Sequence, residues 1–332
     1  MNLYLSRKIA FFHIFGVLLV LPIHTFFPCS ESFSVFRHIF VLLCRSFQPI
    51  YFGLAGYLFF MGYSRGNGYK IKLLKRINTL LFPYLIWNML LVILMYLLYR
   101  NGVESSLIEK AAVYFENISV VNIIKYIFWQ PAAGHLWFIR DLILVSVLSC
   151  PLYYAINKKK WYSLLILFVL ALMTTQTQTA SLFSFAVGGY LSLNDVNIQK
   201  IDKKIIYVSM LICLGLLVYF TYNYTEHNAI PLLSWSTAVL LWTLYDQVIG
   251  KDSNFDVSKW RGSFFFIYLF HDPLLNITCA YTSKLLSHSF VADLFLFMGV
   301  QVFVISVALM VSKLLSGYFP WFYSVLVGSR RK

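Results

Sequence analysis

Long apolar stretches alternate with short polar segments along the whole chain. A helix needs about 20 mostly apolar residues to cross the hydrocarbon core of a bilayer, which is about 30 Å thick. Ten stretches of this character predict ten transmembrane helices, of which the sixth is short. They cover about residues 9–27, 38–62, 80–99, 135–156, 161–175, 180–193, 205–222, 231–249, 263–281 and 291–315. A polar segment at about 100–125 separates the third helix from the fourth.

The composition supports the same fold class. Apolar and aromatic residues fill 60% of the 332 positions, charged residues only 12%, and the mean hydropathy is +0.72. Soluble domains carry about 25% charged residues, so a soluble enzyme is excluded, as are a disordered chain and a fibrous repeat. We therefore expect an all-α, polytopic membrane protein with a single membrane-integral domain over residues 1–332, located in the cell inner (plasma) membrane.

The formal net charge of +14 is unevenly distributed. Twenty of the 27 lysines and arginines lie at the two ends or in every second loop of the ten-helix pattern, and seven lie elsewhere. Cytoplasmic loops of membrane proteins carry such an excess, so both termini are predicted to be cytoplasmic. This basic surface suits anionic lipid headgroups or an anionic soluble substrate, and no nucleic-acid partner is expected.

The first predicted helix carries two histidines, His13 and His24, eleven residues apart. Eleven residues are close to three helical turns, so both side chains are expected on one face. Ionisable groups inside a membrane are costly and commonly line cavities or take part in chemistry. At about 1.5 Å per residue, His24 lies about 22 Å into the core, where it could accept a proton from a hydroxyl. The alternative is a neutral histidine hydrogen-bonded between helices, but for the pair we favour a functional role.

Other polar residues at membrane depth have two interpretations. Arg45, inside the second helix, needs an anion, a carbonyl or a wet cavity, and a structural pairing is an equal alternative. Trp137, near the start of the fourth helix, is typical of an interfacial aromatic anchor. Arg140 and Asp141, which follow it, are expected to be interfacial as well. The run His271-Asp272-Pro273 interrupts the ninth helix, where Asp272 is either a local cap, which we favour, or a residue that orients a histidine.

Lys75 and Arg76 precede the third helix at the expected cytoplasmic face, where they set topology or hold a phosphate group. The sequence lacks a Walker A loop, which argues against a nucleotide-driven motor. It also lacks the HExxH motif of zinc proteases. The five cysteines are widely spaced and predict neither a disulfide framework nor a metal site.

Several of these residues resemble acyltransferase family 3, the membrane-integral enzymes that O-acylate cell-envelope glycans. The resemblance covers nearly the whole chain, including ten spans with cytoplasmic termini. The similar blocks are His13 and His24 separated by ten residues, Gly56-Tyr57-Leu58, Lys75-Arg76 followed by Pro83-Tyr84, Gly134-His135-Leu136-Trp137-Phe138, and Phe266-Ile267-Tyr268-Leu269-Phe270-His271. The sequence departs from the family at His13, where the family has an arginine or lysine, at Ala55 for serine, and at Thr79 for arginine.

The resemblance implies transfer of an acyl group, in the common case acetyl, from cytoplasmic acyl-CoA to a hydroxyl of an extracytoplasmic glycan or lipid-linked saccharide. Acyl-CoA, in the common case acetyl-CoA, is then a co-substrate, and no bound cofactor is expected. His24 serves as the general base or carries the acyl group, while His13 or Arg45 polarises or positions the donor. The CoA phosphates are assigned to Lys75 and Arg76. The acceptor is assigned to outer residues, namely His135, Trp137, His271 and the segment 100–125.

Two other functions remain open from the sequence. A transporter or exporter of a lipid-linked or small solute would use the same intramembrane polar residues as a pathway, although no matching interruptions in two halves support it. An inactive relative of the family would account for the departures at His13, Ala55 and Thr79.

Overall fold

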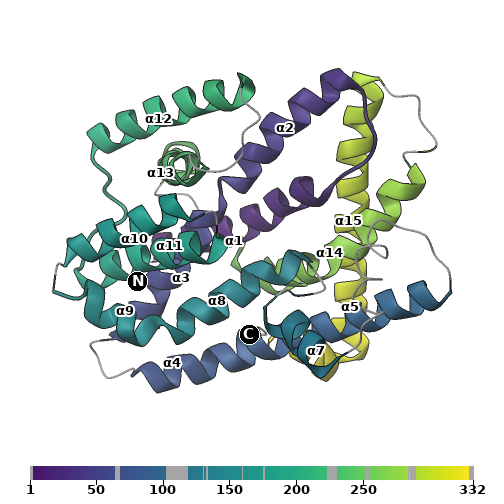
Figure 1. Ribbon diagram of the computed structural model, residues 1–332, viewed down its shortest axis with the longest axis horizontal. Helices are drawn as coiled ribbons and strands as arrows, with labels where there is room; N and C mark the ends of the chain where they lie inside the picture. The colour runs from purple at the N-terminus through teal and green to yellow at the C-terminus, as the bar shows by residue number, and fades with distance from the viewer. Residues whose placement is uncertain are drawn as a thin grey trace.

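The computed structural model describes residues 3–63, 68–101, 119–129, 131, 134–158, 160–174, 176–222, 230–250, 255–282, 284 and 289–328. Within these ranges every regular element is helical, which confirms the predicted all-α class (Figure 1). Most of the predicted polar segment 100–125 lies outside the described residues. The same holds for some of the basic residues behind the topology prediction, among them Arg65, Lys159 and Lys251.

The helices follow one another along the chain as α1 (Leu3–His24), α2 (Glu31–Arg45), α3 (Gln48–Phe60), α4 (Tyr69–Arg76), a π-helical turn (Ile77–Leu81), α5 (Phe82–Arg100), α7 (Val120–Phe128), a 3₁₀ turn (Gly134–Leu136), α8 (Trp137–Val147), α9 (Ser149–Ile156), α10 (Trp161–Met173), α11 (Thr177–Leu193), α12 (Lys203–Tyr222), α13 (Ile230–Val248), a second 3₁₀ turn (Ser258–Trp260), α14 (Arg261–Thr282), α15 (Phe290–Tyr318) and α16 (Pro320–Leu326).

Four helical runs of the described residues are long and apolar enough to cross a membrane, and the protein is therefore a membrane protein. They are Leu3–His24, Glu31–Phe60, Tyr69–Leu94 and Phe290–Tyr318. A fifth is formed if Gly134–Val147 and Ser149–Ile156, which meet at an angle of 61°, count as one span. The total of ten spans and the cytoplasmic position of both termini stay predictions.

The second predicted helix, 38–62, is wrong as a single continuous element. α2 ends at Arg45 and α3 begins at Gln48, with Ser46 and Phe47 between them. Pro49 occupies the first turn of α3, where its missing N–H is harmless, whereas the same residue would break a continuous helix. The two helices still form one run of membrane-spanning length, Glu31–Phe60, with Arg45 and Gln48 on either side of the break.

Other predicted boundaries also shift. α1 begins six residues earlier than expected and ends at His24, so the catalytic candidate lies at its last residue. The third predicted helix is preceded by α4 and the π-helical turn, which join it without a gap. The predicted interruption of the ninth helix is wrong, because α14 continues through Pro273.

α1 lies at the centre of the assembly, between two apolar clusters (Figure 1). One cluster joins the second half of α1 to α5, α14 and α15, and includes Leu21, Phe266 and Val304. The other joins the first half of α1 to α3 and α13, and includes Phe12 and Trp242. Because both sides of α1 are packed, the position of His24 at its end is fixed by the surrounding helices.

Glycines bring α3 and α11 into backbone contact. A Cβ atom added at Gly188 would lie 1.8 Å from the carbonyl oxygen of Gly53, and one at Gly56 would lie 2.0 Å from that of Phe185. Small residues allow such close approach, which stabilises helix pairs in membranes through backbone packing. The pair forms one wall of the pocket described below.

Gly188→Ala is therefore expected to destabilise the protein. The added methyl group meets backbone atoms that cannot rotate away, so the helices must separate, at a cost of about 1–3 kcal/mol or more. Thermal unfolding of the purified protein in detergent measures the change. The matched control is Gly215→Ala on α12, where an added Cβ meets no atom within 4 Å. Equal melting temperatures for the two variants would contradict the predicted role of this contact.

Candidate functional site

His24 is held at the end of α1 by contacts on both sides. The residue after it, Thr25, is fully buried and donates its hydroxyl to the carbonyl of Leu21 at 2.8 Å. The guanidinium of Arg37, on α2, donates to the carbonyl of Thr25 at 3.0 Å. An arginine in this position satisfies a carbonyl that the end of the helix leaves unpaired. The chain direction after His24, and with it the imidazole, is thereby defined.

Three histidines from three segments surround one carboxylate. His24 Nδ1 lies 3.4 Å from Asp272 Oδ1, and His135 Nδ1 lies 3.4 Å from Asp272 Oδ2. The ring centroid of His271 lies 5.2 Å from that of His24 and 5.0 Å from that of His135. The structure thus brings together three predicted site residues, and it adds Asp272, for which the sequence favoured a capping role.

Pro273 explains part of this geometry. Proline has no N–H, so the carbonyl of Leu269 one turn earlier lacks its helical donor. His135 supplies one, because its Nε2 lies 3.3 Å from that oxygen. His271 donates Nδ1–H to the carbonyl of Tyr268 at 2.7 Å. These two bonds to α14 fix the orientation of both imidazoles.

Asp272 itself has a further partner on α14. The side-chain amide of Asn276 donates to the Asp272 carbonyl at 2.8 Å and lies 3.3 Å from its Oδ1. A carboxylate with several hydrogen-bonding neighbours keeps a defined rotamer and can align an imidazole that faces it. An imidazole that faces a carboxylate in this way is similar in geometry to the base-and-orienting-carboxylate pairs of many acyl-transfer and hydrolytic sites.

Within this cluster, called here the His/Asp cluster (His24, His135, His271 and Asp272), the members differ in accessibility. The His24 side chain is 26% exposed, whereas those of His135 and Asp272 are 0% and 11% exposed. His271 is also buried. His24 is thus the most accessible member of the cluster, and the other three lie buried around it. His135 and His271, predicted to contact the acceptor, are buried instead.

Arg45 is the last residue of α2. Its side chain is exposed and its charge acts on both His24 and Arg37. No hydrogen-bond partner is recorded for it in the described part of the chain. An unpaired cation near a base can attract an anionic or strongly polarised group. Arg45 thus lies within electrostatic range of His24.

His13 lies away from the cluster but is connected to it by ring contacts. Its ring stacks on Tyr51 at a centroid distance of 6.0 Å, and Tyr51 donates its hydroxyl to the His13 carbonyl at 2.8 Å. Tyr51 contacts Phe138 at 5.3 Å, and Phe138 contacts Tyr268 at 6.0 Å. Tyr268 in turn lies 6.0 Å from His271. An aromatic column therefore follows the face of α1 between the two histidines.

Lys75 and Arg76 lie on α4, next to the end of α3. The Arg76 guanidinium lies 6.0 Å from the Phe59 ring centroid, while Lys75 is exposed. One turn earlier, Lys72 donates to the carbonyls of Phe59 and Met61 and so closes the last turn of α3. These three basic residues form a separate group, with no recorded contact to the His/Asp cluster among the described residues.

In an alternative to histidine chemistry, a cysteine thiol carries the acyl group. The candidate is Cys29, in the loop after α1. Burial and the nearby charge of Asp293 raise the pKa of the Cys29 thiol above its ordinary value. A raised pKa keeps the sulfur protonated, and the thiolate is the reactive form. Cys29 therefore does not fit the role of a nucleophile.

The same cluster contains atoms spaced for a cation. One ligand atom each from His24, His271 and Asp272 lie within 4.8 Å of one another. Imidazole nitrogen and carboxylate oxygen are ligands that zinc accepts. The sequence-based prediction that no metal is bound stays a prediction.

Arg140 and Asp141, expected to be interfacial, form a buried pair in the structure, and their depth in the membrane stays a prediction. Both are buried, and Arg140 donates two hydrogen bonds to Asp141 Oδ1, at 2.9 and 2.7 Å. Ser181 on α11 donates to the other carboxylate oxygen at 3.3 Å. The pairing of the charges permits their burial. It also joins α8 to α11 directly beside a pocket.

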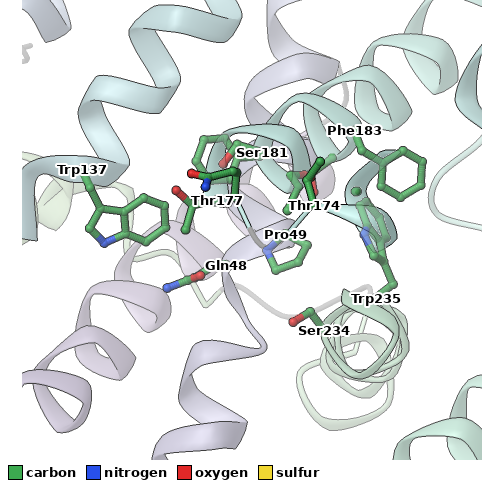
Figure 2. Close-up of a pocket in the computed structure, with 14 residues that line it drawn as sticks. Gln48, Pro49, Trp137, Thr174, Thr177, Ser181, Phe183, Ser234 and Trp235 are labelled. Atoms are coloured by element: carbon green, nitrogen blue, oxygen red, sulfur yellow. The ribbon is translucent and has the colours of Figure 1, made fainter. Parts of the chain in front are cut away.

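That pocket has a volume of about 180 Å³ and lies between α3, α8, α10, α11 and α13 (Figure 2). Trp137 stands at one side and Trp235 at the other, with Gln48 and Pro49 between them. Its lining residues are Gln48, Pro49, Phe52, Trp137, Ala171, Thr174, Gln176, Thr177, Ala180, Ser181, Phe183, Ser184, Ser234 and Trp235. Only Trp137 among them was a sequence-based candidate.

A second polar group missed in the sequence lies at the other end of α1. Lys8 is fully buried, forms an ion pair with Asp246 at 2.7 Å and lies 3.9 Å from the Trp242 ring centroid. Tyr4 also donates to Asp246. No local pattern predicts this pairing, because the two partners are on α1 and α13, far apart along the chain. It fixes the base of α1 against α13.

Comparison with known proteins gives two matches. A family whose description is "Acyltransferase domain" matches residues 9–316. The chain is 25% identical over 249 residues to the Succinoglycan biosynthesis protein ExoH of Rhizobium meliloti (strain 1021). That alignment covers 70% of this chain and 66% of the relative, slightly less than two thirds of its length. No solved structure matches.

Proposed function

This chain belongs to the acyltransferase family that matches most of its length, and we propose that it transfers an acyl group from cytoplasmic acyl-CoA to a hydroxyl of an extracytoplasmic glycan. Acetyl is the proposed acyl group, and a glycan or lipid-linked saccharide is the proposed acceptor. The name of the curated relative, a succinoglycan biosynthesis protein, supports a polysaccharide as the acceptor class.

The observation that carries the proposal is the pairing of an accessible imidazole with a buried carboxylate. Asp272 faces His24 Nδ1, which leaves Nε2 as the proton acceptor. The ring of His24 is the accessible member of the cluster. A histidine so placed can act as a general base near neutral pH. The distance of 3.4 Å is longer than an ideal hydrogen bond, as is common before substrate binds.

In the proposed reaction, His24 accepts the proton of the acceptor hydroxyl while the hydroxyl oxygen bonds to the thioester carbonyl carbon. The carbon–sulfur bond then breaks, and the leaving CoA sulfur takes the proton back from His24. The products are an ester and free CoA. Arg45 is proposed to stabilise the negative charge that develops on the carbonyl oxygen, since it is a nearby cation without a partner in the described part of the chain.

The donor is proposed to reach His24 along the aromatic column that begins at His13. Lys75 and Arg76 are proposed to hold the CoA phosphates, because arginine and lysine bind phosphate oxygens strongly. Under this proposal both lie at the cytoplasmic face, and His24 lies in the outer half of the membrane. The two substrates would then meet at His24, and neither would have to cross the whole membrane.

Mass spectrometry of surface glycans from the host, with and without the gene, tests the proposal. We expect deletion to remove an alkali-labile acyl ester from one glycan. Expression of the wild-type protein should restore the ester, while a transport-only role would change the amount of glycan and leave its ester content intact. Unchanged ester content in the deletion strain would contradict the proposed function.

A further inference from the structure

The pocket between Trp137 and Trp235 lies outside the His/Asp cluster, yet it is joined to it through α8. His135 belongs to the cluster and Trp137, two residues later, forms a wall of the pocket. One turn further on, Asp141 accepts a hydrogen bond from Ser181, which also lines the pocket. Any ligand in the pocket therefore lies next to the segment that carries His135.

The lining is uncharged. Among its described residues there is neither a lysine or arginine nor an aspartate or glutamate. Arg140 and Asp141, behind Ser181, neutralise each other. An acidic ligand would lose its hydration here without gaining a cation, which is unfavourable. The pocket thus suits a neutral molecule.

Polar groups in the lining are suited to hydroxyl groups. The side chains of Gln48, Gln176 and Ser234 have no hydrogen-bond partner among the described residues. Each offers both a donor and an acceptor. A polyhydroxylated ligand can satisfy such groups, whereas an apolar one would leave them unpaired at a cost.

The two tryptophans supply flat apolar surfaces. Figure 2 shows Trp137 and Trp235 on opposite sides of the space that Gln48 and Pro49 border. The pocket has a volume of about 180 Å³. This is the scale of one six-membered sugar ring, whose C–H faces pack on aromatic rings and whose hydroxyls point to polar side chains.

We infer that this pocket binds a single neutral sugar residue of the acceptor between Trp137 and Trp235. The inference rests on the proposed function for the identity of the reaction, but the binding itself does not require catalysis. Gln176 and Thr177 are exposed at the turn before α11. They therefore form the side through which the rest of a longer saccharide leaves the pocket. Neutral acceptors are preferred over uronic acids.

Binding to the purified full-length protein in nanodiscs tests the inference, with saturation-transfer NMR as the readout. The probes are cellotetraose, which is neutral, and tetragalacturonate, which is acidic. We expect the neutral probe to bind at least about tenfold more tightly than the acidic one, and Trp235→Ala to weaken it at least about tenfold. Trp235→Phe should restore most of the affinity, because it keeps a flat ring. Trp161→Ala, at the far end of α10, is the matched control and should bind like the wild type.

Acyl-transfer kinetics on the same variants separate this inference from the proposed function. Trp235→Ala should raise the KM for the neutral acceptor and leave the KM for acyl-CoA unchanged. Binding that depends on Trp235 without any acyl transfer would overturn the function and retain the site. Acyl transfer with a Trp235→Ala variant that binds cellotetraose like the wild type, or equal affinity for tetragalacturonate, would overturn the inference.

Discussion

His24→Ala is expected to reduce acyl transfer by about a thousandfold or more, while acyl-CoA still binds. A positioned general base contributes about 10²–10⁴ in rate, and an alanine leaves no group that can replace it. A thousandfold loss corresponds to about 4 kcal/mol in the activation barrier. Transfer of radiolabelled acetyl from acetyl-CoA to a saccharide by purified protein measures the rate, and calorimetry measures donor binding.

A second variant and a control distinguish chemistry from folding. His24→Gln keeps a polar side chain that can face Asp272 but cannot act as a base at neutral pH, so it should be as inactive as His24→Ala. His38→Ala, on α2 and outside the His/Asp cluster, should retain nearly wild-type activity. Rates within tenfold of the wild type in both His24 variants would remove this histidine from the chemistry.

The class of structure followed from the sequence because apolar length is a local property. Stretches of about 20 apolar residues form helices in a membrane whatever their neighbours are, since the backbone must satisfy its own hydrogen bonds there. The positions at which helices break depend more on long-range contacts. Pro49 separates α2 from α3, whereas Pro273 leaves α14 continuous. At Pro273 the freed carbonyl of Leu269 is near His135, a residue that the sequence alone does not place beside it.

The site shows the same division between local and long-range information. His24 stands out because an ionisable residue in an apolar helix is rare. Asp272 does not stand out in the same way, because an acidic residue before a proline is also a common helix cap. Its role depends on the arrival of His24 and His135 from two other segments.

The pocket was the least accessible feature to sequence reasoning. Its polar members, such as Gln48, Ser181 and Ser234, come from three helices and belong to no spaced motif. Arg140 and Asp141 were expected at an interface because charges usually lie there, but their mutual pairing permits burial. Such pairings depend on how α8 packs against α11, which carries Ser181, a hydrogen-bond partner of Asp141.

Asp272→Asn is expected to lower kcat by about 10²–10⁴ while the KM values for both substrates change little. Asparagine keeps the size of aspartate but has no negative charge, so it stabilises a protonated His24 less. Its amide group can also donate to His24 Nδ1, which would place the proton of the neutral ring on Nε2, where the base must be free. Loss of the carboxylate in related base–carboxylate pairs reduces kcat by about 10⁴ through this tautomer effect.

A positioning role for Asp272 makes a distinct prediction from a purely structural one. Asp272→Asn should unfold near the wild-type temperature, since the amide can still face both His135 and Asn276, and it should bind acyl-CoA normally. Asp202→Asn, an exposed aspartate that accepts a hydrogen bond from the Lys204 N–H at the start of α12, is the matched control and should keep full activity. Should Asp272→Asn instead lose donor binding and thermal stability together, the carboxylate would hold the helices in place rather than orient the base. An intact kcat would separate Asp272 from catalysis altogether, because no other described carboxylate faces His24.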